Sequence, residues 1–391
     1  MAIYTIKFYV ELKEKKEFFD NEKINYRKIY HIPNVIKDQL VAEIIKEGDE
    51  NLEEESEFLY NTYEEAISIF SDDFYISQND RNKIFAKISG KIYDKDGKFY
   101  ITDKLEIENV DFSTGNIFFV GDLFIKNEIK SGFEVKAKNI FVNGNINNSK
   151  VAAGEKVITK GGIIGIQGKK NCYIKADKMV VANFVENSII ECKGTIYIKK
   201  SCMHSDIYSG EKIIVEEPGY IVGGNILAKQ NIMANIVGSK WGTYTLLKVG
   251  IDPFKYLRLK EILQKKEKKE ELYENVNKSL VYLNEVLEEG KGTEEEREEL
   301  KKEIEDINKK RIQLLNNLER LNNLIEKLKK EIEEDNTKSE LKGGKIFIFK
   351  KVFPGVEVKV GLDSLKIKDE LNGKLMFYFE KGKINFKELK D

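Results

Sequence analysis

The chain has 391 residues, a mass of 45.2 kDa and a formal net charge of −1 at pH 7. A near-neutral charge excludes the basic footprint of a dedicated duplex-DNA-binding protein, and no apolar run reaches the ~18–20 residues that span a bilayer. The first ten residues alternate like a strand and lack the layout of a signal peptide. We therefore expect a cytoplasmic protein that neither binds nucleic acid nor inserts into a membrane.

The chain has few residues suited to metal or redox chemistry. Its three cysteines, Cys172, Cys192 and Cys202, lack paired Cys-x-x-Cys spacing, which argues against a disulfide framework or a zinc site. The only histidines are His31 and His204. We expect reduced thiols, no bound metal and no cofactor.

Residues 1–97 have the mixed pattern of a small α+β module. A strand is predicted by four alternating apolar residues, Tyr4, Ile6, Phe8 and Val10. Residues 33–47 have the spacing of an amphipathic helix that stops at Gly48.

The second half of this module begins with an acidic stretch, residues 49–57, which predicts a solvated loop. Thr62 and Glu65 follow with the spacing of a capping box. This spacing predicts a short helix that begins after Thr62.

Residues 98–252 repeat one apolar pattern. Each copy starts with an apolar residue, which is followed two positions later by a small or apolar residue. The first positions are Phe118, Val135, Val151, Ile174, Ile190, Ile207 and Ile226, at intervals of 17, 16, 23, 16, 17 and 19 residues. Such short returns leave no room for crossover helices and suit strands stacked as coils. The predicted fold class is mainly β, a right-handed parallel β-helix (β-solenoid).

Alternate residues of each copy are expected to fill the interior. Small interior residues mark a corner where opposite walls come close: Ala137, Ala153, Ala176, Cys192, Ser209 and Ala228. In the copy that starts at Ile174, the pattern assigns Met179 and Val181 to the interior. The longest interval contains Gly162-Ile-Ile-Gly-Ile-Gln-Gly168, which predicts a loop that leaves the coil.

Residues 253–340 predict a coiled-coil helical hairpin. In the first helix, apolar residues follow a 3-4 spacing that is interrupted by Lys266 and Lys269: Leu259, Ile262, Tyr273, Val276, Leu280, Leu283 and Leu287. The second helix keeps a strict 4-3 alternation at Leu300, Ile304, Ile307, Arg311, Leu314, Leu318, Leu321, Ile325, Leu328 and Ile332. Such an alternation is typical of a left-handed coiled coil.

The two helices are expected to pair with each other. Gly290-Lys-Gly292 predicts the turn between them, and Thr293 and Glu296 predict a capping box for the second helix. At about 1.5 Å per residue, each arm extends roughly 50 Å from the solenoid. Residues 341–391 return to strand patterns, which we expect to complete or cap the solenoid.

From about residue 98 to residue 391, the chain resembles the flagellar assembly protein A family of β-solenoid proteins. The matching segments are Thr114–Phe118, Gly121–Ile125, Ala176–Ala182, His204–Ser205, Gly219–Ala228, Ile236–Ser239, Val249–Pro253 and Val352–Val358. Their order, solenoid then coiled coil then a return segment, is more specific than any single motif. The resemblance implies a role in flagellar assembly or in organisation at the cell pole, and it supplies no catalytic residues.

The residues themselves predict no catalytic, cofactor-binding or metal site. His204 lies close to Cys202 and Ser205, but residues so near in sequence rarely face each other as a triad requires, so a structural corner is the preferred interpretation. Cys192 falls in the small interior position and is interpreted as core. The pairs of glycines at 161–162 and 223–224 lack the Gly-Lys-Ser/Thr ending of a phosphate-binding loop and fit solenoid corners.

Charged residues of the repeats are expected to point outward without forming a column: Asp177, Lys178, Glu191, Glu211 and Lys212. The sequence thus favours a non-enzymatic scaffold that binds protein partners through the hairpin, with self-association open. Two alternatives remain: a solenoid that polymerises end to end as a cytoskeletal element, and a β-helix that binds or modifies saccharides.

Overall fold

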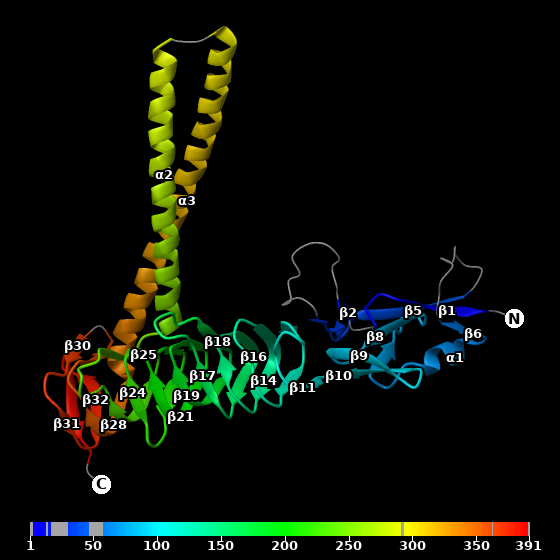
Figure 1. Cartoon of the computed structure of the whole chain (residues 1–391), viewed down its shortest axis with the longest axis horizontal. Coiled ribbons are helices and arrows are strands. Elements are labelled where there is room, and N and C mark those ends of the chain that lie inside the picture. The colour runs from blue at the N-terminus through cyan, green and yellow to red at the C-terminus, as the bar shows by residue number, and fades with distance from the viewer. Residues whose placement is uncertain are drawn as a thin grey trace.

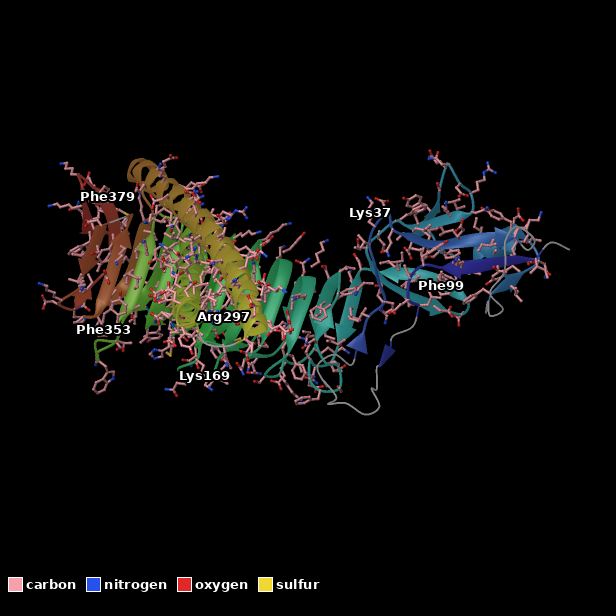
Figure 2. The ribbon with its side chains drawn as sticks, turned by 90° about the horizontal axis from the view of Figure 1, so that it is seen from above. Lys37, Phe99, Lys169, Arg297, Phe353 and Phe379 are labelled. Atoms are coloured by element: carbon pink, nitrogen blue, oxygen red, sulfur yellow. The ribbon has the colours of Figure 1, made fainter. Side chains whose placement is uncertain are left out.

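The computed structural model describes residues 3–12, 15–16, 30–46, 58–290, 293–361 and 363–389. A small β-rich module lies at the N-terminal end, a β-solenoid follows it, and two long helices project from the solenoid (Figure 1). Seen from above, the module and the solenoid follow each other along the long axis of the molecule (Figure 2). The C-terminal strands lie at the far end of the solenoid from the N-terminal module. The predicted architecture, a mainly β solenoid with an inserted helical hairpin, is confirmed.

The N-terminal module contains a five-stranded sheet in the order β6-β1-β5-β8-β7. Its elements are β1 (Tyr4–Phe8), β5 (Leu40–Lys46), β6 (Leu59–Tyr60), α1 (Tyr63–Ser68), β7 (Phe74–Ile76) and β8 (Lys83–Ala86). Smaller sheets are formed by β2 (Lys15–Lys16), β3 (Tyr30–His31), β4 (Asn34–Val35), β9 (Gly90–Lys95) and β10 (Lys98–Thr102). The helix predicted after Thr62 is present, and the Glu65 backbone N–H donates to Thr62 Oγ1 at 3.1 Å.

The helix predicted over residues 33–47 is wrong, because β4 and β5 form there. A turn joins these strands, and in it Asp38 has a φ of 65°. Val41 and Ile44 are buried in β5, which pairs with both β1 and β8. Such β-branched residues suit a pleated sheet. Gly48 and the acidic stretch 49–57 lie outside the described residues.

The solenoid begins at β11 (Lys104–Ile107) and pairs successive coils in parallel. Its strands up to the hairpin are β12 (Ile117–Phe118), β13 (Asp122–Ile125), β14 (Glu134–Val142), β15 (Ile146–Asn147), β16 (Lys150–Thr159), β17 (Gly162–Ile164), β18 (Cys172–Ala176), β19 (Met179–Glu186), β20 (Ser188–Cys192), β21 (Thr195–Met203), β22 (Asp206–Ser209), β23 (Lys212–Val215), β24 (Tyr220–Val222), β25 (Gly224–Ala228), β26 (Asn231–Val237) and β27 (Thr245–Val249). After the hairpin follow β28 (Lys345–Val352) and β29 (Val356–Val360).

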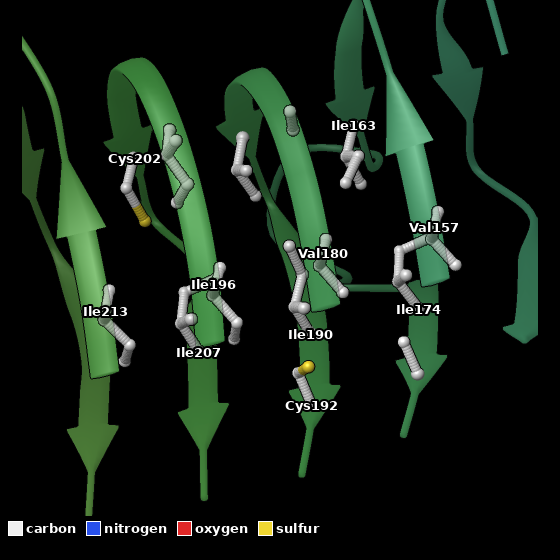
Figure 3. Packing of buried hydrophobic residues seen from close by; sticks show 14 of the residues in the cluster. Val157, Ile163, Ile174, Val180, Ile190, Cys192, Ile196, Cys202, Ile207 and Ile213 are labelled. Atoms are coloured by element: carbon white, nitrogen blue, oxygen red, sulfur yellow. The ribbon is translucent and has the colours of Figure 1, made fainter. Parts of the chain in front are cut away.

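The core consists of columns of inward side chains, one from each coil. One column contains Val135, Val151, Ile174, Ile190, Ile207 and Ile226, which pair in register and are all buried. Figure 3 shows Ile174, Ile190 and Ile207 of this column beside a second column that contains Val157, Val180, Ile196 and Ile213. Each fully buried side chain of this size contributes roughly 1.5–3 kcal/mol.

Two copies of the repeat are shifted by one residue from the predicted alignment. Ile117, and not Phe118, pairs with Val135, while Phe118 is 45% exposed. Val180 pairs with Val157, so Met179 and Val181 face outward rather than inward. In both copies the predicted pattern places two residues at the corner between the inward residues. The structure has three residues there.

The small-residue corner is confirmed, because all six predicted residues are buried. Ala137 pairs with Ala153, and the column continues through the coils to Ala228. The loop predicted at 162–168 begins later than expected: residues 162–164 form β17, and the chain leaves the coil only between Gly165 and Asn171. Ile166 in this loop is 44% exposed.

The two ends of the solenoid differ: antiparallel strands pair with the last coil, whereas among the described residues no strand of the N-terminal module pairs with β11 or β12. At the N-terminal end Ile32 joins the solenoid core, and the Asn34 side chain donates to the Phe118 carbonyl at 2.9 Å and accepts from the Val120 N–H at 3.2 Å. At the other end β28 and β29 complete a coil, and antiparallel strands then pair with them. These strands are β30 (Asp363–Lys366), β31 (Leu371–Asn372), β32 (Leu375–Glu380) and β33 (Lys383–Glu388).

Replacing Ile207 by alanine should lower the free energy of unfolding by about 2–5 kcal/mol, because it leaves a cavity between Ile190 and Ile226. Urea titration followed by circular dichroism measures this change. The matched control Ile166→Ala, in the exposed loop, should change the free energy by less than about 0.5 kcal/mol. An Ile207→Ala variant as stable as the parent would contradict the stacked core.

Candidate interaction surfaces

The hairpin is inserted at a corner of the solenoid. Between β25 and β26 this corner consists of Lys229 and Gln230 alone. One coil later β27 ends at Val249 and β28 begins at Lys345, and these two residues are in register with the end of β25 and the start of β26. The hairpin therefore replaces a two-residue corner and interrupts no strand pairing.

Gly250 and Gly344 lie side by side where the chain leaves the coil and returns to it. A Cβ atom at Gly344 would lie 2.7 Å from the Gly250 nitrogen and 2.6 Å from the Gln230 carbonyl oxygen, so a larger residue does not fit. Gly250 has a φ of 90°, which glycine adopts without strain. The corner hydrogen bonds are kept, since Gly250 N–H donates to the Lys229 carbonyl at 3.2 Å.

The hairpin consists of α2 (Pro253–Glu288) and α3 (Glu294–Lys342), which lie side by side and project from the solenoid (Figure 1). Asp252 caps α2 by accepting a hydrogen bond from the Phe254 N–H at 2.9 Å. The predicted capping box at α3 is confirmed: Thr293 N–H donates to Glu296 Oε2 at 2.7 Å, and Glu296 N–H donates to Thr293 Oγ1 at 3.4 Å. Lys291 and Gly292 of the predicted turn lie outside the described residues.

The two helices contact each other along the predicted seam. Near the solenoid, Leu259, Ile262, Leu321, Leu324, Ile325 and Leu328 form one apolar cluster. Farther out, Tyr273, Val276, Leu280, Ile304, Ile307 and Leu314 form a second cluster. Eleven of the predicted apolar seam residues thus lie in these clusters and Leu324 joins them unpredicted, whereas Leu283, Leu287, Leu300, Leu318 and Ile332 belong to neither cluster.

Polar residues interrupt the seam between and within these clusters. Lys266 lies between them and forms an ion pair with Glu270 at 3.4 Å. Arg311 lies in the seam near the second cluster, and its Nε is buried without a hydrogen-bond partner among the described residues. A buried donor left unpaired costs about 1–3 kcal/mol. The seam is therefore less stable than an uninterrupted apolar one.

One flank of the hairpin carries exposed apolar side chains. Val281 is 59% exposed, Ile312 is 53% exposed and Leu315 is 44% exposed. Their spacing from the seam residues places all three on the same flank of the antiparallel pair. We call these three residues the hairpin patch. Asn277, Asn284 and Asn308 share this flank, which makes it poor in charge over this stretch.

A second apolar surface runs along the outside of the solenoid. It consists of outward side chains that pair from coil to coil: Phe124, Phe141, Ile158, Val181, Tyr197, Ile214, Met233 and Phe347. All are partly exposed. The Phe124 and Phe141 rings stack with centroids 4.7 Å apart. We call this column the apolar stripe.

The sequence analysis missed the apolar stripe, although the repeat contains its signal. The stripe residue is the one between the two inward apolar residues of the second half of each copy, as Phe141 is between Ile140 and Val142. That position is apolar in every coil from Phe124 to Phe347. The hydrophobicity of the outward positions was therefore the missed signal.

A solenoid, an inserted hairpin and closing strands, in this order, are also the elements of a known protein family. The sequence profile described as the flagellar assembly protein A β-solenoid domain matches residues 103–384. The chain belongs to the flagellar assembly protein A family. No curated protein and no solved structure matches the chain.

In this flagellar assembly protein A member, the residues near His204 do not converge. Cys202 is buried in the core (Figure 3), whereas His204 is exposed at a corner with a φ of 48°. The Ser205 hydroxyl donates to the Met203 carbonyl at 2.7 Å and accepts from the Ser188 N–H at 3.1 Å. The Ser205 hydroxyl thus links neighbouring coils.

All three cysteine side chains lie in the solenoid interior. Burial raises the pKa of Cys192 to about 11 and the pKa of Cys202 to about 12. It raises the pKa of Cys172 as well. Since the thiolate is the reactive form, these thiols are poor nucleophiles at neutral pH.

The glycines and charged residues singled out in the sequence lie at corners and on outer faces. Gly224 has a φ of 88°, and a Cβ there would lie 2.1 Å from the Ser205 carbonyl oxygen. Charged residues pair between coils: Asp177 contacts Lys193 at 2.9 Å, Lys178 contacts Glu155 at 3.1 Å and Glu211 accepts from Thr195 at 2.8 Å. Glu191 and Lys212 lie on the outer faces of β20 and β23.

The described part of the chain lacks both a metal-binding cluster and a membrane-spanning helix. No group of three or more histidine, cysteine or acidic side chains there is arranged to hold a metal ion. None of the described helices is both long and apolar enough to cross a membrane.

At about pH 8 a thiol reagent such as dithionitrobenzoate should label none of the three cysteines in the folded protein, and all three after denaturation in guanidinium chloride. Because folding raises the thiol pKa values, this difference should persist until the pH approaches about 11. Absorbance of the released chromophore measures labelling. Rapid labelling of even one native thiol would contradict the buried positions.

Replacing Arg311 by methionine should stabilise the hairpin by about 1–3 kcal/mol, because it removes the unpaired buried Nε and adds apolar contact in the seam. Hydrogen exchange of the amides in α2 and α3 measures local stability. The control Lys310→Met changes a neighbouring exposed residue and should leave exchange nearly unchanged. Faster exchange in Arg311→Met would show that Arg311 has a stabilising partner.

Proposed function

We propose that this chain is a non-enzymatic cytoplasmic scaffold that holds protein partners on a rigid solenoid and a projecting helical hairpin. Family membership supports a role in flagellar assembly or in organisation at the cell pole. The observation that carries the proposal is the corner insertion. Because two residues suffice at the equivalent corner, the solenoid does not need the hairpin for its pairing. A long segment that the fold does not require is explained by binding.

The hairpin patch is the proposed recognition surface of the hairpin. Paired helices present side chains at fixed spacing, and an exposed apolar group within a charged surface marks a contact site. The patch combines Val281 from α2 with Ile312 and Leu315 from α3, so a partner contacts both helices at once. A second copy of this chain is one such partner, and self-association is therefore part of the proposal.

Two observations favour this function over the alternatives. End-to-end polymerisation needs uncovered coils, whereas antiparallel strands cover the C-terminal end and Ile32 of the N-terminal module packs against the core at the other end. A saccharide site calls for aligned carboxylates or aromatic rings. The apolar stripe contains no carboxylate, and Ile158 and Val181 separate its stacked phenylalanines from Tyr197. Its mixed aliphatic and aromatic character suits a protein surface.

The test compares the tagged full chain with two variants and a matched control in affinity capture from lysates of the source cells. In the first variant, residues 251–343 are removed, so Gly250 and Gly344 form the two-residue corner seen in the preceding coil. In the second, Val281, Ile312 and Leu315 are replaced by lysine in an otherwise complete hairpin. Mass spectrometry identifies the captured proteins.

We expect the same partners to disappear from both variants. The matched control replaces three exposed residues on the hairpin, Lys302, Lys309 and Lys310, by glutamine and should retain every partner. Capture that survives removal of the hairpin would contradict the hairpin as a recognition arm and direct attention to the apolar stripe. Circular dichroism of each variant verifies that the solenoid remains folded.

A further inference from the structure

A cavity of about 260 Å³ lies at the base of the hairpin. It is bounded on one side by the first turns of α2 and on the other by the outer faces of β22, β25, β27 and β29. The lining residues are Tyr208, Asn225, Leu227, Leu246, Lys248, Tyr256, Leu257, Lys260 and Lys359. Three of them are lysines and none is acidic.

The lysines converge from both sides of the cavity. Lys248 on β27 and Lys359 on β29 are paired neighbours in the strand ladder, so their side chains leave the same face one strand apart. Lys260 comes from α2. The Lys248 ammonium lies 4.9 Å from the centroid of the Tyr256 ring. Strand register and helix packing together bring these three cations to one site.

Acidic side chains also lie near the cavity, and Glu191 is the ladder neighbour of the lining residue Tyr208. Glu357 accepts a hydrogen bond from the Tyr244 hydroxyl at 2.7 Å and forms an ion pair with Lys359 at 3.1 Å. Asp206 forms an ion pair with Lys170 at 2.8 Å and accepts from the Asn225 amide at 2.8 Å. Lys359 is therefore paired within the wall, whereas Lys248 and Lys260 form no ion pair among the described residues and are the cations available to a ligand.

This arrangement is costly when the cavity holds only water. Like charges on directly opposed ladder positions destabilise a sheet, and Lys248 and Lys359 are such a pair. Burial and the charge of Lys359 lower the pKa of Lys248. An anion in the cavity would offset this repulsion.

We propose that the cavity binds a small phosphate, either inorganic phosphate or a phosphomonoester. Lysine ammonium groups act as point charges toward phosphate oxygens. The volume lies just below the range of ordinary ligand pockets, which restricts the ligand to a small molecule. Leu227, Leu246 and Leu257 provide apolar contacts for an ester group. This binding site does not depend on the proposed scaffold function.

The bound phosphate would connect the solenoid to the hairpin. Lys248 and Lys359 belong to the solenoid wall, whereas Lys260 and Tyr256 belong to α2. An anion held by both groups adds charge-assisted contacts across a junction that the backbone joins only through Gly250 and Gly344. We therefore expect the ligand to slow amide exchange in the first turns of α2.

Isothermal titration of the full chain with inorganic phosphate, and separately with glycerol 3-phosphate, tests the site at constant ionic strength in a chloride buffer. We expect saturable binding of at least one of the two probes. Lys248→Gln and Lys260→Gln should each weaken the binding about tenfold to a hundredfold, the effect of losing one hydrogen bond to a charged group. Lys199→Gln, at an exposed position on β21, is the matched control and should bind like the parent.

Hydrogen exchange with and without the better probe locates the effect. Slower exchange at residues 253–262 in the parent, lost in Lys260→Gln, supports the cavity as the site. Because Lys260 is exposed on a helix, this variant should retain the parent's circular dichroism spectrum. The proposal is overturned if neither probe binds saturably, or if the Lys248 and Lys260 variants bind as tightly as the parent. Binding that inorganic phosphate shows and glycerol 3-phosphate does not restricts the ligand to the free ion.

Discussion

The parallel register between successive coils is the constraint on which the rest of this structure depends. Each coil repeats the position of every residue in the coil before it, so an inward Ile190 lies between Ile174 and Ile207. The same register aligns outward residues just as strictly. It therefore creates the buried columns, the apolar stripe and the adjacent lysines at 248 and 359 by one mechanism. The strand ladder thus determines which residues are neighbours both in the core and on the surface.

Register also explains how the fold tolerates a long insertion. The strands on either side of a corner are fixed by the coil below them, so the corner itself contributes little to alignment. The cost of lengthening a loop rises only slowly with its length. Here the corner glycines, Gly250 and Gly344, keep the two chain segments as close as the shorter corner does. The helices then supply their own stability through the seam.

The sequence predicts the register of the solenoid well where apolar runs are short. In the copies that start at Ile190 and Ile207 no apolar run exceeds three residues, and the predicted alignment agrees with the structure. The alignment is wrong by one residue at Phe118 and at Met179, which lie in runs of four apolar residues, 117–120 and 179–182. Such a run leaves open which of its alternate residues face inward. At Met179 the run includes Val181 of the apolar stripe, so there the surface feature that the sequence analysis missed is also a cause of the error.

Other features could not be predicted because they depend on contacts between distant segments. The stretch at 33–47 forms strands because two neighbouring strands pair with Leu40–Lys46, and no local signal specifies those neighbours. The hairpin seam, by contrast, was predicted because its heptads are local. The lysine cavity needs both the coil register and the direction in which α2 leaves the corner. Lys260 and Lys359 are far apart in the sequence, and only the insertion point brings them together.

The direction of the hairpin is determined by contacts at its base. Two glycines connect it to the solenoid, and glycine restricts the backbone least of all residues. Ile251 and Pro253 are buried at the junction, and Lys248 contacts the Tyr256 ring. A ligand in the adjacent cavity can shift the orientation of the hairpin only if it binds one orientation more tightly than another. Since the proposed phosphate would contact both α2 and the wall, it would favour the orientation in which α2 lies against the wall. The base of the hairpin is therefore the position at which a small molecule would add contacts between the solenoid and the hairpin.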